Sequence, residues 1–186
     1  MARAGLSRDR VAEEAAVMAD EIGLRKLTLV ALAVRLGVRQ PSLYKHIDSL
    51  DGLQRGIALE AKRELGDVLA RAAVGQAGPD AVRALAQAYR RWVLEHPGRY
   101  AATVRAPAPD DEDDRRVSDE VVQVVLDVLS GFGLRGSHGI DAARTLRAAL
   151  HGFVLLEAAG GFGLPRDVAR SYSFLVDTLI AGFERR

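Results

Sequence analysis

The residues best suited to chemistry lie in a stretch of 26 residues, from Ile22 to Ile47, that contains no Asp or Glu. The chain as a whole has a formal net charge of only +1, so this stretch is locally positive within a balanced sequence. Its basic residues are Arg25, Lys26, Arg35, Arg39 and Lys45. A compact positive surface attracts the phosphate backbone of nucleic acids. The stretch therefore points to a nucleic-acid partner.

The same stretch predicts two short helices joined by a turn. The first helix is expected to begin after Thr28, a suitable N-cap, and to end at Gly37, which lets the chain turn with a positive φ. Pro41 suits the first turn of the second helix, because its missing N–H would be unpaired there anyway. Leu29, Leu32 and Ala33 of the first helix are expected to face the core. This spacing is typical of a helix-turn-helix, which places its second helix in the major groove of DNA.

Leu43 and Ile47 are expected to anchor the second helix from the inside, which leaves its other side chains pointing outward. Arg39 has the forked donors and Gln40 the amide that purine edges require, and each good pair contributes about 1–3 kcal/mol of discrimination. The side chains better suited to phosphate oxygens are those of Thr28, Tyr44, Lys45 and His46. The alternative is a merely solvated basic face, because short helices joined by glycine occur in many all-α proteins.

The periodicity of apolar residues predicts helices over almost the whole chain. We expect them at about 7–23, 28–37, 41–47, 49–73, 82–96, 98–104, 117–132, 140–159 and 165–186, with a strand as the alternative for the valine-rich segment at 117–132. The segment VGQAGP at 74–79 reads as a linker. The predicted fold is all-α. It has an N-terminal three-helix DNA-binding domain at 1–52, and 53–186 form a second helical domain reached through a linking helix at about 49–73.

The composition excludes several classes of protein. There is no Cys, which excludes disulfides, thiol nucleophiles and Cys-ligated zinc. The first ten residues lack the apolar core of a signal peptide, and no stretch reaches the roughly 18 uncharged apolar residues that a membrane span needs. We therefore expect a cytoplasmic protein without a membrane partner.

The polar residues do not predict an enzyme. The four His show no metal-binding spacing, and the chain has neither a glycine-rich phosphate loop nor a Ser in a nucleophile elbow. The acidic run from Asp110 to Asp114 fits no metal-ligand spacing, and we expect it to form a solvated loop. No catalytic residue, metal site or cofactor is expected.

The motif Leu36-Gly37-Val38, followed by Gln40-Pro41-Ser42 and Leu43-Tyr44-Lys45-His46, resembles the DNA-binding half of the TetR family of transcriptional regulators. The run Gln-Pro-Ser-Leu-Tyr is especially similar to the tetracycline repressors, and the match covers about residues 7–60. The resemblance implies that Gln40, Pro41 and Ser42 face bases, while Thr28, Tyr44 and His46 hold the backbone.

Two positions depart from the family pattern. Leu50 stands where members usually have a Lys that contacts phosphate, and Val30 stands where some tetracycline repressors have an Arg. Both changes predict fewer contacts per half-site. They leave open the alternative of a small-molecule-binding helical module with weak or lost operator binding.

The segment around His151-Gly152 is similar to a TetR-type C-terminal domain known by its Trp and His-Gly pair, although the Trp is absent here. The resemblance implies a ligand-binding and dimerisation domain whose last two helices form a four-helix bundle with a second subunit. Residues that allow this bundle, or that are simply core, are Leu150, Val154, Ala158, Tyr172, Leu175, Val176, Leu179 and Phe183. Candidate residues of a ligand pocket are Tyr89, Trp92, Tyr100, Phe132, His151, Phe153 and Phe162, with His151 and Glu157 as polar groups.

The expected function is that of a homodimeric, DNA-binding transcriptional regulator, a repressor released by ligand. Its expected partners are a double-stranded DNA operator, a second copy of the chain and a small-molecule inducer.

Overall fold

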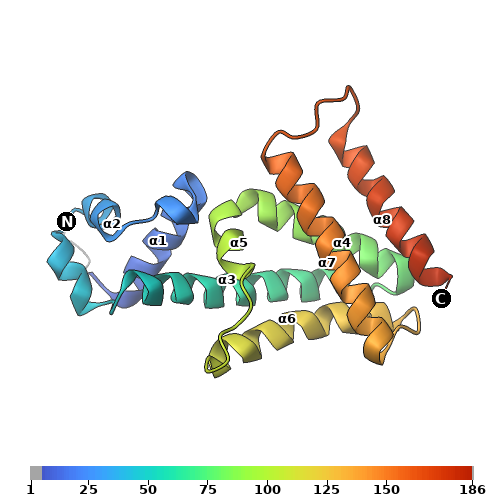
Figure 1. Ribbon diagram of the computed structural model, residues 1–186, viewed down its shortest axis with the longest axis horizontal. Coiled ribbons are helices and arrows are strands. Elements are labelled where there is room, and N and C mark those ends of the chain that lie inside the picture. Colours follow the sequence, from blue (N-terminus) through green and yellow to red (C-terminus); the bar gives the residue numbers. More distant parts are fainter. Residues whose placement is uncertain (1–5, 186) are drawn as a thin grey trace. The chain divides into compact units, whose positions relative to one another are not determined.

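The computed structural model describes residues 6–185, and Figure 1 shows that they form helices joined by turns and loops, without a strand. The predicted all-α fold is confirmed, and the valine-rich segment is helical. The elements are α1 (Arg8–Ile22), η1 (Leu24–Lys26), α2 (Leu29–Leu36), η2 (Gln40–Lys45), α3 (Leu50–Ala73), α4 (Gly78–Glu95), α5 (Pro97–Thr103), α6 (Glu112–Ser130), α7 (Gly136–Ala158) and α8 (Val168–Glu184). Among the described residues, no helix combines the length and the apolar character that crossing a membrane requires.

The chain divides into two compact units. The first unit consists of the residues up to Arg63 together with Glu95–Arg115, and the second unit consists of Glu64–Leu94 and Arg116–Arg186. Helices α3 and α6 each contribute residues to both units.

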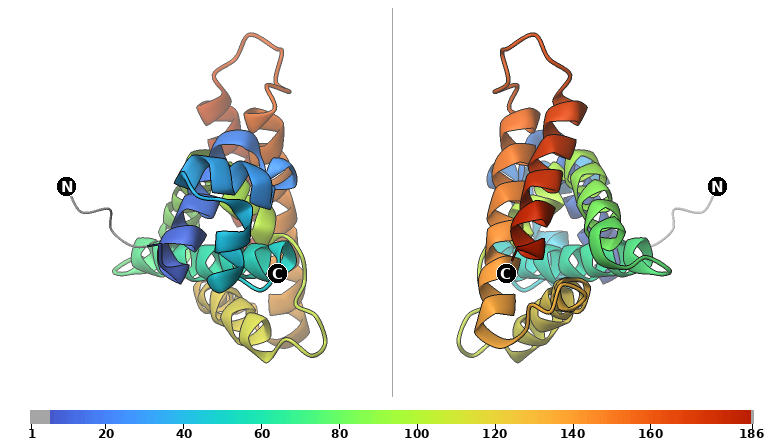
Figure 2. Two further views of the ribbon diagram at one scale, coloured as in Figure 1. Left: turned by 90° about the vertical axis from the view of Figure 1, so that its left-hand side faces the viewer. Right: turned by 90° about the vertical axis from the view of Figure 1, so that its right-hand side faces the viewer.

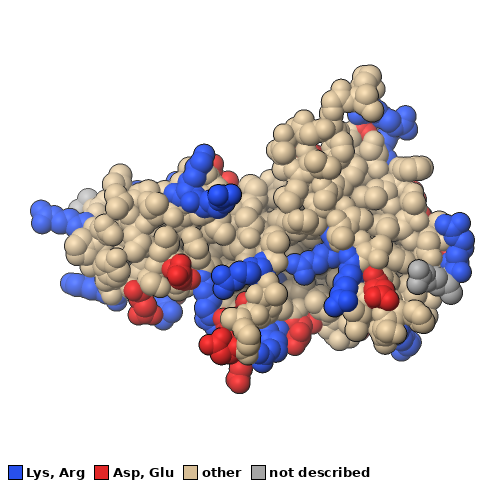
Figure 3. Space-filling view, in the orientation of Figure 1, with Lys and Arg blue, Asp and Glu red and all other residues tan. Residues whose placement is uncertain are grey.

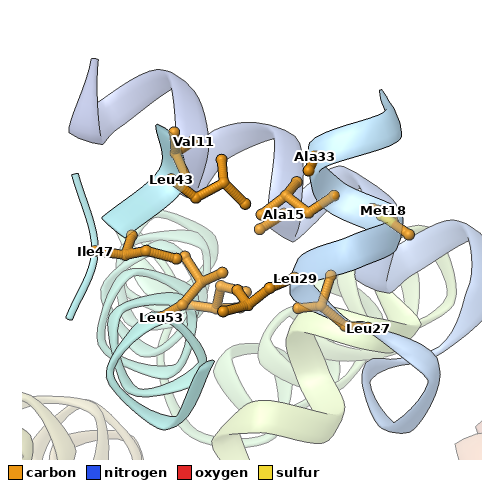
Figure 4. Packing of buried hydrophobic residues seen from close by; sticks show 11 residues of the cluster. Val11, Ala15, Met18, Leu27, Leu29, Ala33, Leu43, Ile47 and Leu53 are labelled. Atoms are coloured by element: carbon orange, nitrogen blue, oxygen red, sulfur yellow. The ribbon is translucent and has the colours of Figure 1, made fainter. Parts of the chain in front are cut away.

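The core of the first unit is formed by α1, α2, η2 and the first turns of α3, whose apolar side chains converge in Figure 4. Its buried members are Val11, Ala15, Met18, Leu27, Leu29, Leu32, Ala33, Leu43, Ile47, Leu53 and Ile57. On α1 they recur at a spacing of three or four residues, so one helical face is turned inward. Burying a side chain of the size of Leu contributes about 1.5–3 kcal/mol, so this cluster fixes how the short helices pack.

The helix ends in the first unit follow the sequence signals. The Ser7 hydroxyl accepts a hydrogen bond of 3.2 Å from the N–H of Arg10, and Thr28 caps α2 in the same way. Gly37 ends α2 in the left-handed region, at φ 66°, which costs glycine little. The Ser49 hydroxyl accepts a hydrogen bond of 2.9 Å from the N–H of Gly52 at the start of α3. The predicted ends of these helices are therefore confirmed.

The segment η2 is a six-residue 3₁₀ helix, in which each turn closes over three residues. The N–H of Ser42 donates to the carbonyl of Arg39 at 2.9 Å, and the N–H of His46 donates to that of Leu43 at 2.8 Å. Pro41 lies in its first turn, where it lacks an N–H to donate. Such a short segment depends on the packing of its buried Leu43.

In the second unit, α7 and α8 lie side by side and run in opposite directions, with their connecting loop beyond the helix ends (Figure 2). Five of the residues that could have faced a second subunit are buried within this chain instead: Leu150, Val154, Tyr172, Val176 and Phe183. They are core residues, because they lie on the faces that α7 and α8 turn toward the rest of their own unit.

The acidic run differs from the expected solvated loop. Helix α6 begins at Glu112, so three of the five acidic residues occupy its first turn. Carboxylates are favourable there, because the unpaired N–H groups of a helix N-terminus carry partial positive charge.

Candidate nucleic-acid interface

The segment η2 presents one anchoring residue to the core and its neighbour to the outside. Leu43 is fully buried, whereas the side chain of Tyr44 is 53% exposed. Arg39, Pro41 and Lys45 are exposed as well. Gln40, Ser42 and His46 are half-buried. The outward faces expected for Tyr44 and Lys45 are thus present on a segment that Leu43 holds from inside.

Thr28 caps α2 with its hydroxyl oxygen and still has a hydroxyl proton to donate. Its hydroxyl oxygen accepts a hydrogen bond of 3.2 Å from the N–H of Ala31, which caps α2. A hydroxyl that accepts in this way still has its own O–H to donate. Because Thr28 is exposed, that O–H is available to a phosphate oxygen.

Arg35 does not belong to the basic surface, although it lies within the positive stretch. Its guanidinium forms ion pairs with Glu14 and Glu21 of α1, including a hydrogen bond of 3.0 Å from Nη2 to Oε1 of Glu21. These hydrogen bonds raise the pKa of Arg35, and they hold the pKa of Glu21 below its ordinary value. Arg35 therefore ties α2 to α1. The local sequence contains no signal for this, because the partners lie 21 and 14 residues away.

The remaining basic side chains of the stretch, Arg25, Lys26, Arg39 and Lys45, are exposed. No carboxylate within residues 6–185 forms an ion pair with Arg39 or Lys45. Figure 3 shows Lys and Arg side chains projecting from the edge of the first unit that holds η2. Positive charge is thus available beside the segment whose side chains suit DNA bases.

The two departures from the family pattern have different surroundings. Leu50 is half-buried and packs against the core of the first unit. The charged end of a Lys at this position would not make that apolar contact. Val30 is 59% exposed on α2, so it presents methyl groups to the outside in place of a guanidinium. Neither side chain can donate a hydrogen bond to phosphate.

The candidate pocket residues are divided between the two units. Tyr100 is buried on α5 in the first unit, whereas the other six lie in the second unit. Phe153 lies next to Phe162, with ring centroids 4.6 Å apart, and next to Tyr172 at 5.1 Å. Phe132 instead lies beside Phe183, at 6.0 Å. The structure thus brings Phe153 and Phe162 together, and it places Phe132 in a separate aromatic contact.

Next to the Phe153 contacts lies an ion pair that the sequence did not reveal. Arg90 Nε donates to Glu157 Oε2 at 2.7 Å, and both side chains are less than one-fifth exposed. The same guanidinium lies 5.3 Å from the ring centre of Tyr172. Glu157 is therefore already paired, and Arg90 is a polar group of this region that lacks a sequence signal, since its partner is 67 residues away.

His151 is the other polar group that was expected here. Partial burial, and secondarily the charge of Arg147, lower the pKa of His151 from its ordinary value. This shift favours the neutral imidazole, in which one ring nitrogen can donate while the other accepts.

Comparison with known proteins identifies this arrangement. A family model described as a tetracyclin repressor-like C-terminal domain matches residues 82–179. An HTH-type transcriptional regulator of Mycobacterium tuberculosis is 40% identical over 184 residues, which cover 98% of this chain and 84% of the relative. The chain belongs to the TetR family of transcriptional regulators. This TetR-family protein is a DNA-binding regulator and not an enzyme.

Two further likenesses cover almost the whole TetR-family chain. The HTH-type transcriptional regulator YobS of Bacillus subtilis is 34% identical over 181 residues, covering 97% of this chain and 94% of the relative. The crystal structure of a TetR variant from Acinetobacter baumannii in complex with minocycline superposes with a TM-score of 0.72 at 22% identity, covering 97% of this chain and 98% of that one. The second likeness shows the shared fold.

Proposed function

We propose that this protein is a homodimeric repressor that binds a double-stranded DNA operator in the cytoplasm and is released by a small-molecule ligand. The observation that carries the proposal is the outward face of η2, where Tyr44 and Lys45 project beside the buried anchor Leu43. Residues 1–52 are proposed as the DNA-binding domain and 53–186 as the ligand-binding and dimerisation domain, linked by a helix at about 49–73.

The proposed contacts follow from the chemistry of each side chain. Arg39 and Gln40 have donors for base edges in the major groove, and Pro41 and Ser42 lie in the same turn of η2. The residues proposed to hold phosphate oxygens are Thr28, Tyr44, Lys45 and His46.

Dimerisation is proposed because six residues of η2 offer few base contacts. Helix-turn-helix proteins bind tightly by placing two recognition segments about 34–36 Å apart on successive major grooves. Supporting this, α7, α8 and their loop carry large apolar side chains that are at least 42% exposed: Ile140, Leu155, Leu156, Leu164 and Phe174. Large exposed apolar side chains on neighbouring helices are typical of an interface.

The proposed ligand is a small apolar or amphipathic molecule held in the second unit. Support comes from the aromatic side chains of Phe153 and Phe162 beside Arg90 and Glu157, together with His151, whose pKa is lowered. The remaining candidate pocket residues of this unit are Tyr89, Trp92 and Phe132, whereas Tyr100 lies in the first unit and is left out of the proposed pocket. Linkage requires that a ligand that weakens DNA binding binds less tightly to the DNA-bound protein.

The test is a titration of the pure protein with the intergenic DNA upstream of its own gene, at two salt concentrations. The proposal expects sequence-specific binding whose affinity falls as salt rises, because phosphate contacts release counterions. A flat salt response without sequence preference contradicts it. That outcome favours the helical module without operator binding, for which the apolar Leu50 and Val30 are the supporting observations.

A further inference from the structure

The acidic residues before and within the first turn of α6 are built into the first unit as a defined structure, which we call the acidic turn (residues 108–114). The N–H of Asp111 donates to the carbonyl of Ala108 at 3.1 Å, and the guanidinium of Arg115 donates to the carbonyl of Pro109. The carboxylate of Asp111 accepts a hydrogen bond of 3.0 Å from the N–H of Asp114. These bonds hold the carboxylate of Asp111 and the backbone of Asp114 in place.

The carboxylates of Asp111 and Asp114 are paired with basic side chains of α3. Arg55 donates from Nε and Nη2 to the two oxygens of Asp111, at 2.5 and 2.6 Å. Lys62 Nζ lies 2.5 Å from Oδ1 of Asp114. Arg55 and Lys62 are seven residues apart, which is two helical turns, so they lie on one face of α3. The acidic turn thus holds α3 at two points of the same face.

The two ion pairs of the acidic turn differ in burial. The side chains of Asp111 and Asp114 are each 14% exposed and that of Lys62 is 7% exposed, whereas that of Arg55 is 47% exposed. Removing Asp114 leaves the shielded charge of Lys62 without compensation, whereas removing Asp111 frees the more exposed guanidinium of Arg55 from its two hydrogen bonds. Asp113, by contrast, is 62% exposed and lies 3.7 Å from Arg55.

The opposite side of α3 belongs to the DNA-binding core. Leu53 and Ile57 flank Arg55 in the sequence at a distance of two residues, which turns them away from it by about 200°. Both are buried in the cluster that also contains Leu43, the anchor of η2. A displacement of the first turns of α3 therefore reaches η2 through direct packing.

We propose that Asp111 is a positioning residue for operator binding, and that it acts through Arg55 on the first turns of α3. Asp114 holds the same face of α3 through its ion pair with Lys62. The inference rests on the proposed function, because it concerns how the segment that meets the operator is held. Asp111 itself does not touch DNA, and its negative charge disfavours long-range attraction to phosphate.

That charge provides the decisive test. Replacing Asp111 by Arg adds positive charge, so a purely electrostatic effect strengthens DNA binding, whereas loss of positioning weakens it. The probe is a fluorescently labelled duplex carrying the site that the wild-type protein selects from random DNA, and the readout is the Kd from fluorescence anisotropy. We expect Asp111→Arg to raise the Kd by about tenfold, which corresponds to about 1.4 kcal/mol. The matched control, Asp110→Arg, makes the same charge change at an exposed neighbour and is expected to leave the Kd unchanged or lower.

The reversed pair supplies a second readout, which tests whether the effect depends on the contact between residues 55 and 111. Arg55→Asp alone is expected to weaken binding, and the double variant Arg55→Asp with Asp111→Arg is expected to return the Kd to within about threefold of wild type, because residues in contact are energetically coupled. If Asp111→Arg binds as tightly as the Asp110→Arg control, or if the reversed pair fails to restore the affinity, the inference is wrong.

Circular dichroism and the thermal midpoint check that each variant is folded. If Asp111→Arg does not fold, the isosteric Asp111→Asn replaces it, with an expected weakening of about threefold, or about 0.65 kcal/mol. An unchanged Kd for Asp111→Asn then overturns the inference. If the wild-type protein selects no site at all, the proposed function fails and this inference fails with it. Selection by wild type combined with insensitivity to Asp111 overturns only the inference.

Discussion

The carboxylate of Asp20 on α1 accepts a hydrogen bond of 2.8 Å from the backbone N–H of Arg99, at the start of α5. The guanidinium of Arg99 approaches the same carboxylate, with Nε 3.0 Å from Oδ2. The backbones of the two helices are therefore very close. A Cβ atom placed on Gly98 would lie 2.0 Å from the carbonyl oxygen of Ala19. Only glycine allows this contact between α1 and α5.

We predict that Gly98→Ala strongly destabilises the protein, because a backbone carbonyl cannot move away as a flexible side chain can. The expected loss is about 3 kcal/mol or more in the free energy of unfolding, measured by urea denaturation. The matched control is Gly56→Ala on α3, where an added Cβ meets no atom within 4 Å. That variant is expected to gain about 0.5–1 kcal/mol, because alanine favours a helix interior. Equal stability of Gly98→Ala and wild type would contradict the close approach.

Tyr44→Ala is predicted to weaken operator binding about tenfold, with little change in stability. Its side chain is 53% exposed and is proposed to hold a phosphate. Anisotropy with the selected duplex measures the Kd, and the thermal midpoint reports stability. A variant that unfolds, or one that binds like wild type, refutes the role assigned to Tyr44.

Tyr172→Phe is predicted to lower the free energy of unfolding by about 1 kcal/mol, because it removes one buried hydrogen bond. Tyr172 on α8 is fully buried, and its hydroxyl donates to the carbonyl of Ala86 on α4 at 2.7 Å. Urea denaturation provides the measurement. Tyr44→Phe, which removes an exposed hydroxyl, is the control and is expected to unfold like wild type. If both variants lose the same stability, the buried bond is not the cause.

Phe174→Ser is predicted to weaken the proposed dimer, raising its dissociation constant at least about tenfold, as expected for a large aromatic residue at an interface. Phe174 is 75% exposed on α8. Val74→Ser is the control, since Val74 is 77% exposed in the turn before α4 and outside the proposed interface. Sedimentation over a range of protein concentrations separates the two outcomes. The proposed interface is wrong if the wild-type protein is a monomer, or if Phe174→Ser and Val74→Ser have the same dissociation constant.

The local features of the first unit could be predicted from the sequence, because each depends on residues that are near in the chain. Thr28 and Gly37 mark the ends of α2, and the spacing of Leu29 and Leu32 identifies the buried face. Contacts between distant residues could not be predicted. The pairing of Arg35 with α1 removes a charge that local composition assigns to the DNA-binding surface.

The same limit applies to the C-terminal half. Apolar spacing on α7 and α8 identifies helices, but it does not distinguish a face buried in the same chain from one that meets a second copy. Val154 and Phe174 are both large and apolar, yet the first is fully buried and the second is exposed. Likewise, a run of acidic residues gives no sign that Asp111 is paired with Arg55, which lies 56 residues earlier.

The stability that Asp111 contributes is predicted to depend on pH in a defined range. Hydrogen bonding from Arg55, and then from the N–H of Asp114, lowers the pKa of Asp111 from an ordinary value of 3.8 to about 2. A carboxylate with a lowered pKa stabilises the folded state above its unfolded pKa, and this contribution is lost as the pH falls toward the folded pKa. The difference in unfolding free energy between wild type and Asp111→Asn should therefore be constant from about pH 7 to 5 and shrink between about pH 4 and 2. Urea denaturation of both proteins at each pH measures this difference. A difference that stays constant down to pH 3 contradicts a strong Arg55–Asp111 pair.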